Sequence, residues 1–251
     1  MDKNNNLIQY KIFESFKNLQ AFTTIKQSLA EENPRFTGDL TELFVNSRKQ
    51  LAAKLRIKLN QFVFPRQTHT NCVAEILKIP ETEINETDAL VTNQPDICLC
   101  IQTADCVPIL LFDPVKNVIA AVHAGWRGTV NKIVEVAINK MVDEYHSSPK
   151  NILAAIGPSI SPEIYEIGNE VVEAVRNSIP NSETTLQKNS NGKFHFNLWE
   201  ANRQLLLSIG VFSDNIEILG ECSFKNNNKY FSARKEGIDT GRTVSGVMLL
   251  K

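Results

Sequence analysis

The stretch ADCVPILLFDPVKNVIAAVHAG, residues 104–125, decides how this chain folds. It contains two apolar runs, at 107–112 and 118–122, whose valine, isoleucine and phenylalanine residues favour β-strands. Between the runs lies DPVKN, residues 113–117, a combination typical of tight turns. The sequence therefore predicts a β-hairpin made of two buried strands.

The turn leaves two registers open for this hairpin. If Pro114 and Val115 are the central turn residues, Cys106 lies directly opposite His123. If the loop extends to a left-handed Asn117, His123 lies diagonally from Cys106. Both registers keep the two side chains on one face, with Cβ atoms about 4.5–5.5 Å apart when opposed and about 7–8 Å when diagonal. A sulfur and an imidazole thus converge at the open end of the hairpin.

Further strands and helices are expected on both sides of the hairpin. Apolar runs predict strands at 62–64, 88–92, 97–102 and 151–157. Amphipathic spacing predicts helices over 39–55, 129–142, 162–179 and 197–210. The first of these helices carries apolar residues at helical spacing, namely Leu40, Leu43, Phe44, Leu51 and Leu55. The class is mixed α/β (α+β), and we expect one domain over residues 1–251.

Residue types at the predicted helix ends support these boundaries. Thr129 is expected to cap the second helix, and Pro162 lies near the start of the third. Asn197 is expected to cap the fourth helix, and Gly210 to end it.

The amino-acid composition limits the binding partners and the cellular compartment that we expect for this protein. With 251 residues, 42% of them hydrophobic, the chain can bury a large core. Its net charge of −1 creates no field that would attract nucleic acid or an acidic membrane, which favours a small-molecule ligand. No apolar run is long enough to cross a bilayer, and MDKNNNLIQY lacks the features of a signal peptide. We expect a cytoplasmic protein whose five irregularly spaced cysteines are free thiols.

A third ligand would turn the Cys106–His123 pair into a metal site, and the chain has only four histidines. His146 lies in a polar stretch and is expected at the surface, while His195 belongs to a short predicted strand. His69, at the end of a strand-like segment, is the better candidate. A His, His, Cys set suits tetrahedral zinc with one position left open for chemistry.

The linker AGWRG, residues 124–128, connects the second hairpin strand to the following helix. Gly125 and Gly128 permit a tight backbone path, and the helix start at Thr129 leaves amides unpaired beside Arg127. Such a helix start is typical of an anion site, so a phosphate would fit there.

The ordered motifs of the chain resemble those of the laccase-domain family, also called the multicopper polyphenol oxidase or YfiH-like family. The resemblance starts with DALVT at 88–92, ADCVP at 104–108 and HAGWRG at 123–128. It continues in GPSISPEIYEIGNEV, FNLWEANRQLLLSIGV and CSFKNNNKYFSARKEGIDTGR, and covers the chain from about Arg66 onward. The sequence departs from the family pattern at Thr70, where a glycine is usual, and at Lys26, where an arginine followed by two glycines is usual.

This resemblance implies a fold, a metal centre and an activity. It implies a four-layer α/β/β/α sandwich of mixed sheets, with one zinc ion held by His69, Cys106 and His123. Family members are similar to purine nucleoside phosphorylases that convert adenosine, inosine and methylthioadenosine to free base and a ribose 1-phosphate product, and that also deaminate adenosine. Purine nucleosides and phosphate are therefore the expected substrates, whereas the preferred nucleoside and the oligomeric state stay open.

Three further residues are candidates for roles in this chemistry. Zinc lowers the pKa of a bound water to about 7, which would let that water attack C6 of adenosine. Arg127 and Arg48 are candidates for holding phosphate, because a guanidinium fork matches phosphate oxygens. Asp105, beside Cys106, is a candidate for orienting a ligand or acting as a base.

Three alternatives remain. Cys106 and His123 would also serve a metal-free cysteine hydrolase as nucleophile and base. A multicopper phenol oxidase needs far more imidazoles than four, although a single copper ion suits the same ligands. The third alternative is a non-catalytic binding protein that retains the fold.

Overall fold

The fold was analysed in a computed structural model, which describes residues 6–37 and 41–251 and, within the first helix, the side chains from Phe44 onward. Leu40 and the side chain of Leu43 lie outside the described part of the chain. The strands are β1 (Leu7–Ile8), β2 (Leu19–Thr24), β3 (Phe62–Val63), β4 (Val73–Glu75), β5 (Ala89–Thr92), β6 (Cys98–Thr103), β7 (Val107–Asp113), β8 (Val118–Ala124), β9 (Leu153–Ile156), β10 (Glu166–Ile167), β11 (Leu186–Lys188), β12 (Phe194–Phe196), β13 (Ile216–Ile218) and β14 (Thr243–Leu249). The α-helices are α1 (Thr41–Leu55), α2 (Trp126–Val130), α3 (Ile133–Tyr145), α4 (Asn169–Ser178), α5 (Leu198–Ser208) and α6 (Ala233–Glu236).

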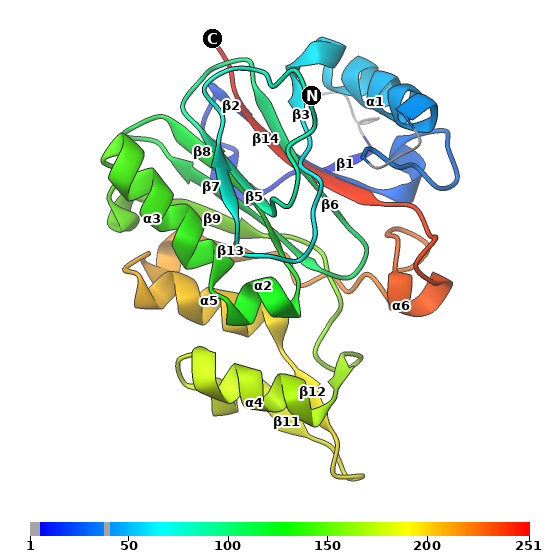
Figure 1. The fold of residues 1–251 in the computed structure, drawn as a ribbon, viewed down its shortest axis with the longest axis vertical. Coiled ribbons are helices and arrows are strands. Elements are labelled where there is room, and N and C mark those ends of the chain that lie inside the picture. Colours follow the sequence, from blue (N-terminus) through cyan, green and yellow to red (C-terminus); the bar gives the residue numbers. More distant parts are fainter. Residues whose placement is uncertain (1–5, 38–40) are drawn as a thin grey trace.

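Two large sheets packed face to face form the centre of the molecule (Figure 1). One has the strand order β1-β2-β14-β6-β3 and the other β13-β9-β7-β8-β5-β4, and both mix parallel with antiparallel pairs. Apolar residues of α1 cover the outer face of the first sheet, and those of α3 and α5 cover the outer face of the second. The expected α/β/β/α sandwich is confirmed. In the described ranges, no helix combines the length and apolarity that crossing a membrane requires.

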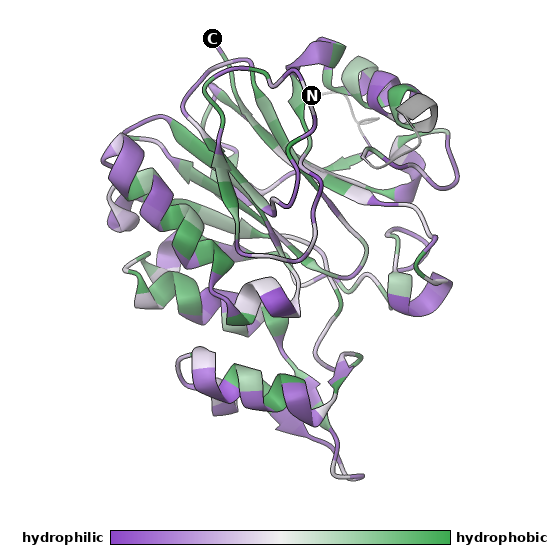
Figure 2. Ribbon diagram, in the orientation of Figure 1, coloured by the Kyte–Doolittle hydropathy of each residue, from purple (hydrophilic) through white to green (hydrophobic). Residues whose placement is uncertain are grey.

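Alternation along the strands explains why whole runs of sequence are apolar. On β7, Ile109 and Leu111 pack against the helix layer, whereas Leu110 and Phe112 pack between the sheets. Strand β6 does the same, with Cys98 and Cys100 on the side of α1. Figure 2 shows apolar residues along the central strands, and helices that are apolar on one side and hydrophilic on the other. Strands with two buried faces are therefore apolar over most of their length.

The central hairpin adopts the second of the two predicted registers. Asp113 pairs with Val118 and Pro108 with His123, so His123 lies diagonally from Cys106. Asn117 is left-handed, with φ of 52°. The register with a two-residue turn is therefore not the one observed. The loop has four residues, and the Asp113 carboxylate stabilises it, because its Oδ1 accepts the amides of the second and third loop residues.

The region 162–179 holds a shorter helix than predicted. Helix α4 spans only Asn169–Ser178, and the preceding β10 (Glu166–Ile167) pairs with β12 (Phe194–Phe196) in a third sheet of order β10-β12-β11. The carbonyl of Tyr165 accepts the amide of Phe196, so this backbone bonds across a sheet instead of along a helix. In Figure 1 the third sheet and α4 form the lower end of the molecule.

The helix predicted from Thr129 is two helices. Helix α2 already begins after Gly125, and a left-handed Lys132, with φ of 58°, separates it from α3. Thr129 therefore does not cap a helix start; its hydroxyl accepts a hydrogen bond from Asn202 instead. The predicted ends of α5 are confirmed, since Asn197 accepts the amide of Glu200 and Gly210 has φ of 101°.

Strand β14 is central to its sheet although its sequence, TVSGVML, shows no simple alternation. Gly246 pairs with Phe22 on one side and Cys100 on the other. A Cβ atom at this glycine would lie 2.6 Å from the Phe22 ring and 3.0 Å from the Cys100 sulfur. The side chains of Phe22 and Cys100 therefore leave no room for a side chain at position 246.

We expect Gly246→Ala to lower the free energy of unfolding by about 1–3 kcal/mol, because it overpacks a closed core. Urea denaturation measures this change. In a double-mutant cycle, combining it with Phe22→Leu should cost less than the sum of the two single changes. Strict additivity would contradict the clash as the cause.

Candidate metal centre

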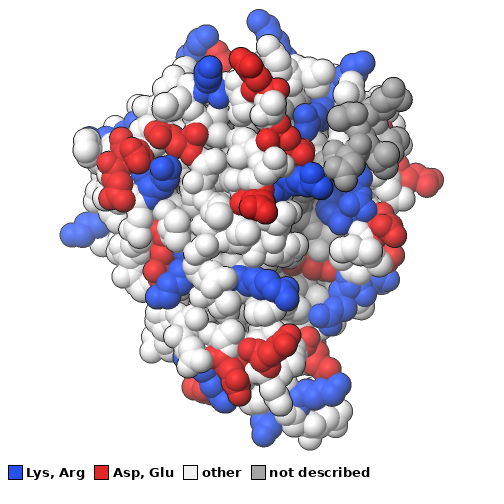
Figure 3. Space-filling view, viewed as in Figure 1, with Lys and Arg blue, Asp and Glu red and all other residues white. Residues whose placement is uncertain are grey.

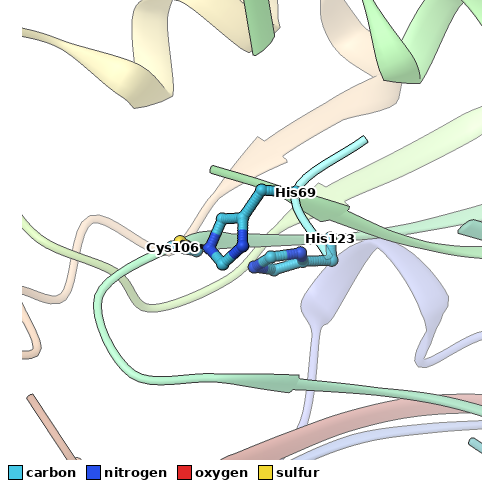
Figure 4. A group of neighbouring side chains, drawn as sticks. All are labelled: His69, Cys106 and His123. Carbon is cyan, nitrogen blue, oxygen red and sulfur yellow. Dashed lines mark hydrogen bonds between the residues drawn. The ribbon is translucent and has the colours of Figure 1, made fainter. Parts of the chain in front are cut away.

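Three side chains from three separate segments converge at one end of the sandwich (Figure 4). His69 lies in the loop after β3, Cys106 directly precedes β7, and His123 lies near the end of β8. Their donor atoms all lie within 4.8 Å of one another. The Cys106 Sγ is 3.8 Å from the His69 Nε2, and the two imidazole centroids are 4.9 Å apart. The structure thus brings together the three residues predicted to hold a metal.

The strand pattern explains why these side chains meet. His123 continues the alternating positions Ile119 and Ala121, which point between the two sheets. Cys106 stands two residues before Pro108, the partner of His123 across the hairpin. Cys106 and His123 therefore lie at the edge of the space between the two sheets, directly beyond the apolar side chains that fill it.

Asp88, which the sequence analysis did not single out, holds two of the three ligands in place. Its Oδ1 accepts hydrogen bonds from the His123 Nδ1 at 2.7 Å and from the His69 amide at 3.0 Å. Its Oδ2 accepts the amides of Thr68 and Thr70 and the Thr70 hydroxyl. A carboxylate on the Nδ1 of His123 leaves the Nε2 of that ring for a metal.

The backbone of His69 is left-handed, with φ of 63°, which is uncommon for a residue other than glycine. Asp88 stabilises this conformation by accepting three consecutive amides, those of residues 68–70. Thr70, where the resembled family has a glycine, adds its hydroxyl to the same carboxylate at 2.8 Å. The departure at Thr70 therefore strengthens the loop that carries His69.

The charges of the site alternate. Burial raises the pKa of the Cys106 thiol, but His123 and His69 outweigh it and lower this pKa to about 6. Burial lowers the pKa of His123, while Cys106 and Asp88 raise it to about 9. Burial raises the pKa of Asp88, yet its hydrogen bond from His123 brings it down to about 2. The three neighbours thus favour a carboxylate at Asp88 and a thiolate at Cys106, and a thiolate is the form of cysteine that binds metals.

The donor set fits a zinc-sized ion. With Zn–N near 2.0–2.1 Å and Zn–S near 2.3 Å, tetrahedral geometry places nitrogen and sulfur ligands about 3.6 Å apart. The observed Cys106–His69 distance of 3.8 Å is close to that value. Three protein donors leave a fourth corner of the tetrahedron for water or substrate.

The triad opens into a cavity of about 230 Å³. Its other walls come from the 35–37 segment, from Gln67 and from β6, and from Ala233, Ile238 and Arg242 near the C-terminus. A larger cavity of about 310 Å³ lies elsewhere, between α1 and residues 80–84, and contains none of the triad. The smaller cavity is therefore the candidate site, because it alone of the two combines space with chemistry.

Arg48, predicted to hold phosphate, is not in the triad cavity. It lines the larger cavity, donates to the Phe36 carbonyl through Nε at 2.9 Å, and lies over the Phe64 ring. Its helix packs on the outer face of the first sheet, away from the gap between the sheets. The structure therefore does not bring Arg48 together with the triad.

Asp105 and Arg127 lie close to the triad residues in the sequence, but neither lines the triad cavity. Asp105 is left-handed, and its carboxylate accepts the Ser223 hydroxyl at 2.6 Å and the Arg234 amide at 2.7 Å. It thus ties the turn before Cys106 to the C-terminal segment. Arg127 is exposed, and its guanidinium lies 4.3 Å above the Trp126 ring. The remaining histidines lie where expected, His146 at the surface and His195 in β12.

Comparisons with known proteins agree with this architecture. A family model described as multi-copper polyphenol oxidoreductase laccase matches residues 28–250. A purine nucleoside phosphorylase of Bacteroides thetaiotaomicron is 36% identical over 265 residues, with 99% of this chain and 98% of that protein covered. Adenosine deaminase RL5, from an unknown prokaryotic organism, is 36% identical over 250 residues, with 93% and 95% covered. The crystal structure of YlmD from Geobacillus stearothermophilus superposes with a TM-score of 0.91 at 27% identity, covering 100% of this chain and 98% of that one.

Proposed function

Because the chain belongs to the multi-copper polyphenol oxidoreductase laccase family, and similar relatives are named purine nucleoside phosphorylase and adenosine deaminase, we propose that it is a purine nucleoside enzyme. Its reactions would be phosphorolysis of adenosine, inosine and methylthioadenosine to free base and the 1-phosphate of the ribose, and deamination of adenosine. The observation that carries this proposal is the convergence of His69, Cys106 and His123 on one cavity.

The metal proposed for this site is one zinc ion, held by His69, Cys106 and His123. When bound, it would supply a Lewis acid that lowers the pKa of water and polarises the substrate. Asp88 would keep His123 in the tautomer that presents Nε2. Asp105 would position Cys106 by anchoring the turn before it, since both of its carboxylate oxygens already accept other hydrogen bonds. Arg127, one residue into α2, is a candidate to attract the anionic substrate.

The family name does not extend to multicopper chemistry in this chain. A type-1 copper together with a three-copper cluster needs far more imidazoles than the four histidines of this sequence, of which only two reach the site. A single copper ion suits the same donors, since copper(II) binds nitrogen and sulfur ligands more tightly than zinc does. The identity of the metal is therefore a question for elemental analysis.

Purified protein should contain about one zinc per chain, and its activities should separate by their need for phosphate. Inosine is expected to yield hypoxanthine only when phosphate is present, whereas adenosine should yield inosine without it. Chromatography of the reaction mixtures measures both conversions, and protein stripped by a chelator is the control. A zinc-loaded protein that converts neither nucleoside would favour a binding protein over an enzyme.

One observation favours a second candidate function, a metal-free cysteine hydrolase. Cys106, His123 and Asp88 form a nucleophile, base and orienting carboxylate in sequence, and the thiol pKa is lowered to about 6. Activity of that kind should survive chelation and be lost on alkylation with iodoacetamide. Activity that chelation removes and zinc restores would exclude it.

We also propose a cytoplasmic location and one domain over residues 1–251. All five cysteines are free thiols, which supports a reducing compartment. Small-molecule nucleosides and phosphate are the proposed partners, in keeping with a net charge of −1.

A further inference from the structure

Two arginines that no sequence motif connects, Arg35 and Arg242, line the same cavity as the metal-type triad. Arg35 precedes α1, and Arg242 directly precedes β14. The two segments are joined by hydrogen bonds, because the Arg242 amide donates to the Pro34 carbonyl at 2.9 Å and the Gly241 amide to the Asn33 side chain at 3.0 Å. The two guanidiniums are thus held on one wall of the site.

Both guanidiniums reach the same atom. The Nη2 of Arg35 donates to the Ile238 carbonyl at 3.1 Å, and the Nη2 of Arg242 donates to that same oxygen at 3.0 Å. Two positive charges are therefore brought close together around a single carbonyl group. Such an arrangement is repulsive unless an anion lies between or beside the two charges.

No carboxylate of the described residues forms a direct ion pair with either guanidinium, although Cys106, Asp239 and Asp105 act on Arg242 from a distance. Neither arginine forms an ion pair there, and their hydrogen bonds go to the backbone carbonyls of residues 238, 240 and 241. The carboxylate of Asp105 accepts its bonds from Ser223 and from the Arg234 amide. Burial lowers the pKa of Arg242 and the charge of Arg35 adds to this, whereas Cys106, Asp239 and Asp105 raise it in part, so that it lies at about 10. The two guanidiniums are half-buried, close together and without a direct ion-pair partner among the described residues.

Other polar groups of the wall already have partners. The Gln102 side chain accepts the Phe36 amide and donates to the Thr37 hydroxyl, and Gln67 bonds the backbone of Gln102 through both of its amide atoms. Arg35 uses one of its several N–H donors in such a bond. The guanidiniums are therefore the cationic groups of this wall with N–H donors left for a ligand. Figure 3 shows lysine and arginine side chains gathered on the side of the molecule that carries α6.

We propose that Arg35 and Arg242 bind the inorganic phosphate that phosphorolysis consumes, so that it lies in the triad cavity beside the metal site. This inference rests on the proposed function. A phosphate dianion would neutralise both charges, and its oxygens match the planar fork of a guanidinium. A neutral purine or ribose would leave the two charges facing each other. The pair replaces Arg48, which lies in the other cavity.

The test compares Arg35→Gln and Arg242→Gln with Arg176→Gln, which removes an exposed guanidinium on α4 that pairs with Glu183 and lies over the Phe194 ring, outside the triad cavity. Phosphate dependence of inosine phosphorolysis is measured alongside adenosine deamination without phosphate. We expect the KM for phosphate to rise about tenfold to a hundredfold in each site variant, because charge-assisted hydrogen bonds are lost. The deamination rate should stay within about twofold, and Arg35→Lys should recover part of the phosphate affinity.

Direct binding keeps this test independent of nucleoside chemistry. Titration calorimetry with inorganic phosphate should show the same loss of affinity in the two site variants and none in Arg176→Gln, even if no nucleoside is converted. An unchanged phosphate KM and affinity in Arg35→Gln and Arg242→Gln would overturn the proposal. An equal loss of deamination and phosphorolysis would also overturn it, since the pair would then serve the nucleoside or the fold. A rise in phosphate KM confined to Arg127→Gln would assign the phosphate to α2 instead.

Discussion

Replacing Cys106 with alanine is expected to abolish metal retention and to lower both phosphorolysis and deamination by about a thousandfold or more. The thiolate is one of three converging donors, and the two remaining imidazoles make a poor site for a catalytic zinc ion. Elemental analysis of the purified variant gives the metal content, and chromatography of adenosine and inosine reactions gives the rates.

Cys72→Ala is the matched control, because it removes an exposed free thiol that is not part of the triad. It should retain metal and both activities. If Cys106→Ala were free of metal and still carried out phosphorolysis at the normal rate, the metal would have no part in that reaction.

Asp88→Asn is expected to weaken zinc binding about tenfold to a hundredfold and to lower the free energy of unfolding by about 2–4 kcal/mol. The buried carboxylate accepts hydrogen bonds from both imidazole-bearing residues and from the two residues beside His69 in its loop. An amide of the same size turns one acceptor into a donor, which would face the N–H groups of that loop. Competition against a chromophoric chelator measures the affinity, and urea denaturation of metal-free protein measures the stability.

Asp113→Asn separates these two effects. Asp113 is also a buried carboxylate that accepts two amides, but it lies in the hairpin turn, at the far end from the triad. Its replacement should reduce stability and leave zinc affinity unchanged. Equal zinc affinities in wild type and Asp88→Asn would show that Asp88 stabilises the fold without positioning the ligands.

The parts of the fold that the sequence predicted are those where one local pattern determines one structure. Apolar runs broken by DPVKN could only form a hairpin, and Asn197 and Gly210 marked both ends of α5. The helix predicted over 162–179 was too long. Its apolar spacing continues through residues whose backbone forms hydrogen bonds with β12 instead of within a helix. Strand β14 was left unassigned, since its burial on both faces is decided by two sheets and a helix that lie far away in the sequence.

The sequence predicted best those site residues that lie on the hairpin. Cys106 and His123 followed from strand alternation, and His69 from elimination among four histidines. Asp88 was overlooked although it directly precedes β5, the strand that pairs with the one bearing His123. An aspartate at the start of a buried strand next to the strand of His123 could have been recognised as a partner of that histidine. Arg242 closes the last of the resembled motifs, but nothing in the sequence joined it to Arg35, because only the hydrogen bonds between the 33–34 and 241–242 segments make the two neighbours.

The left-handed Asn117 sits at the opposite end of the hairpin from the ligands, yet it sets their spacing. Side chains on a strand switch sides with every residue, so deleting one loop residue would rotate the whole of β8 by half a turn. His123 would then face α3, and the apolar residues that now pack on that helix would fill the space beside Cys106. The number of residues in this surface loop therefore decides whether His123 faces Cys106. The identities of the loop residues can vary far more freely than their number.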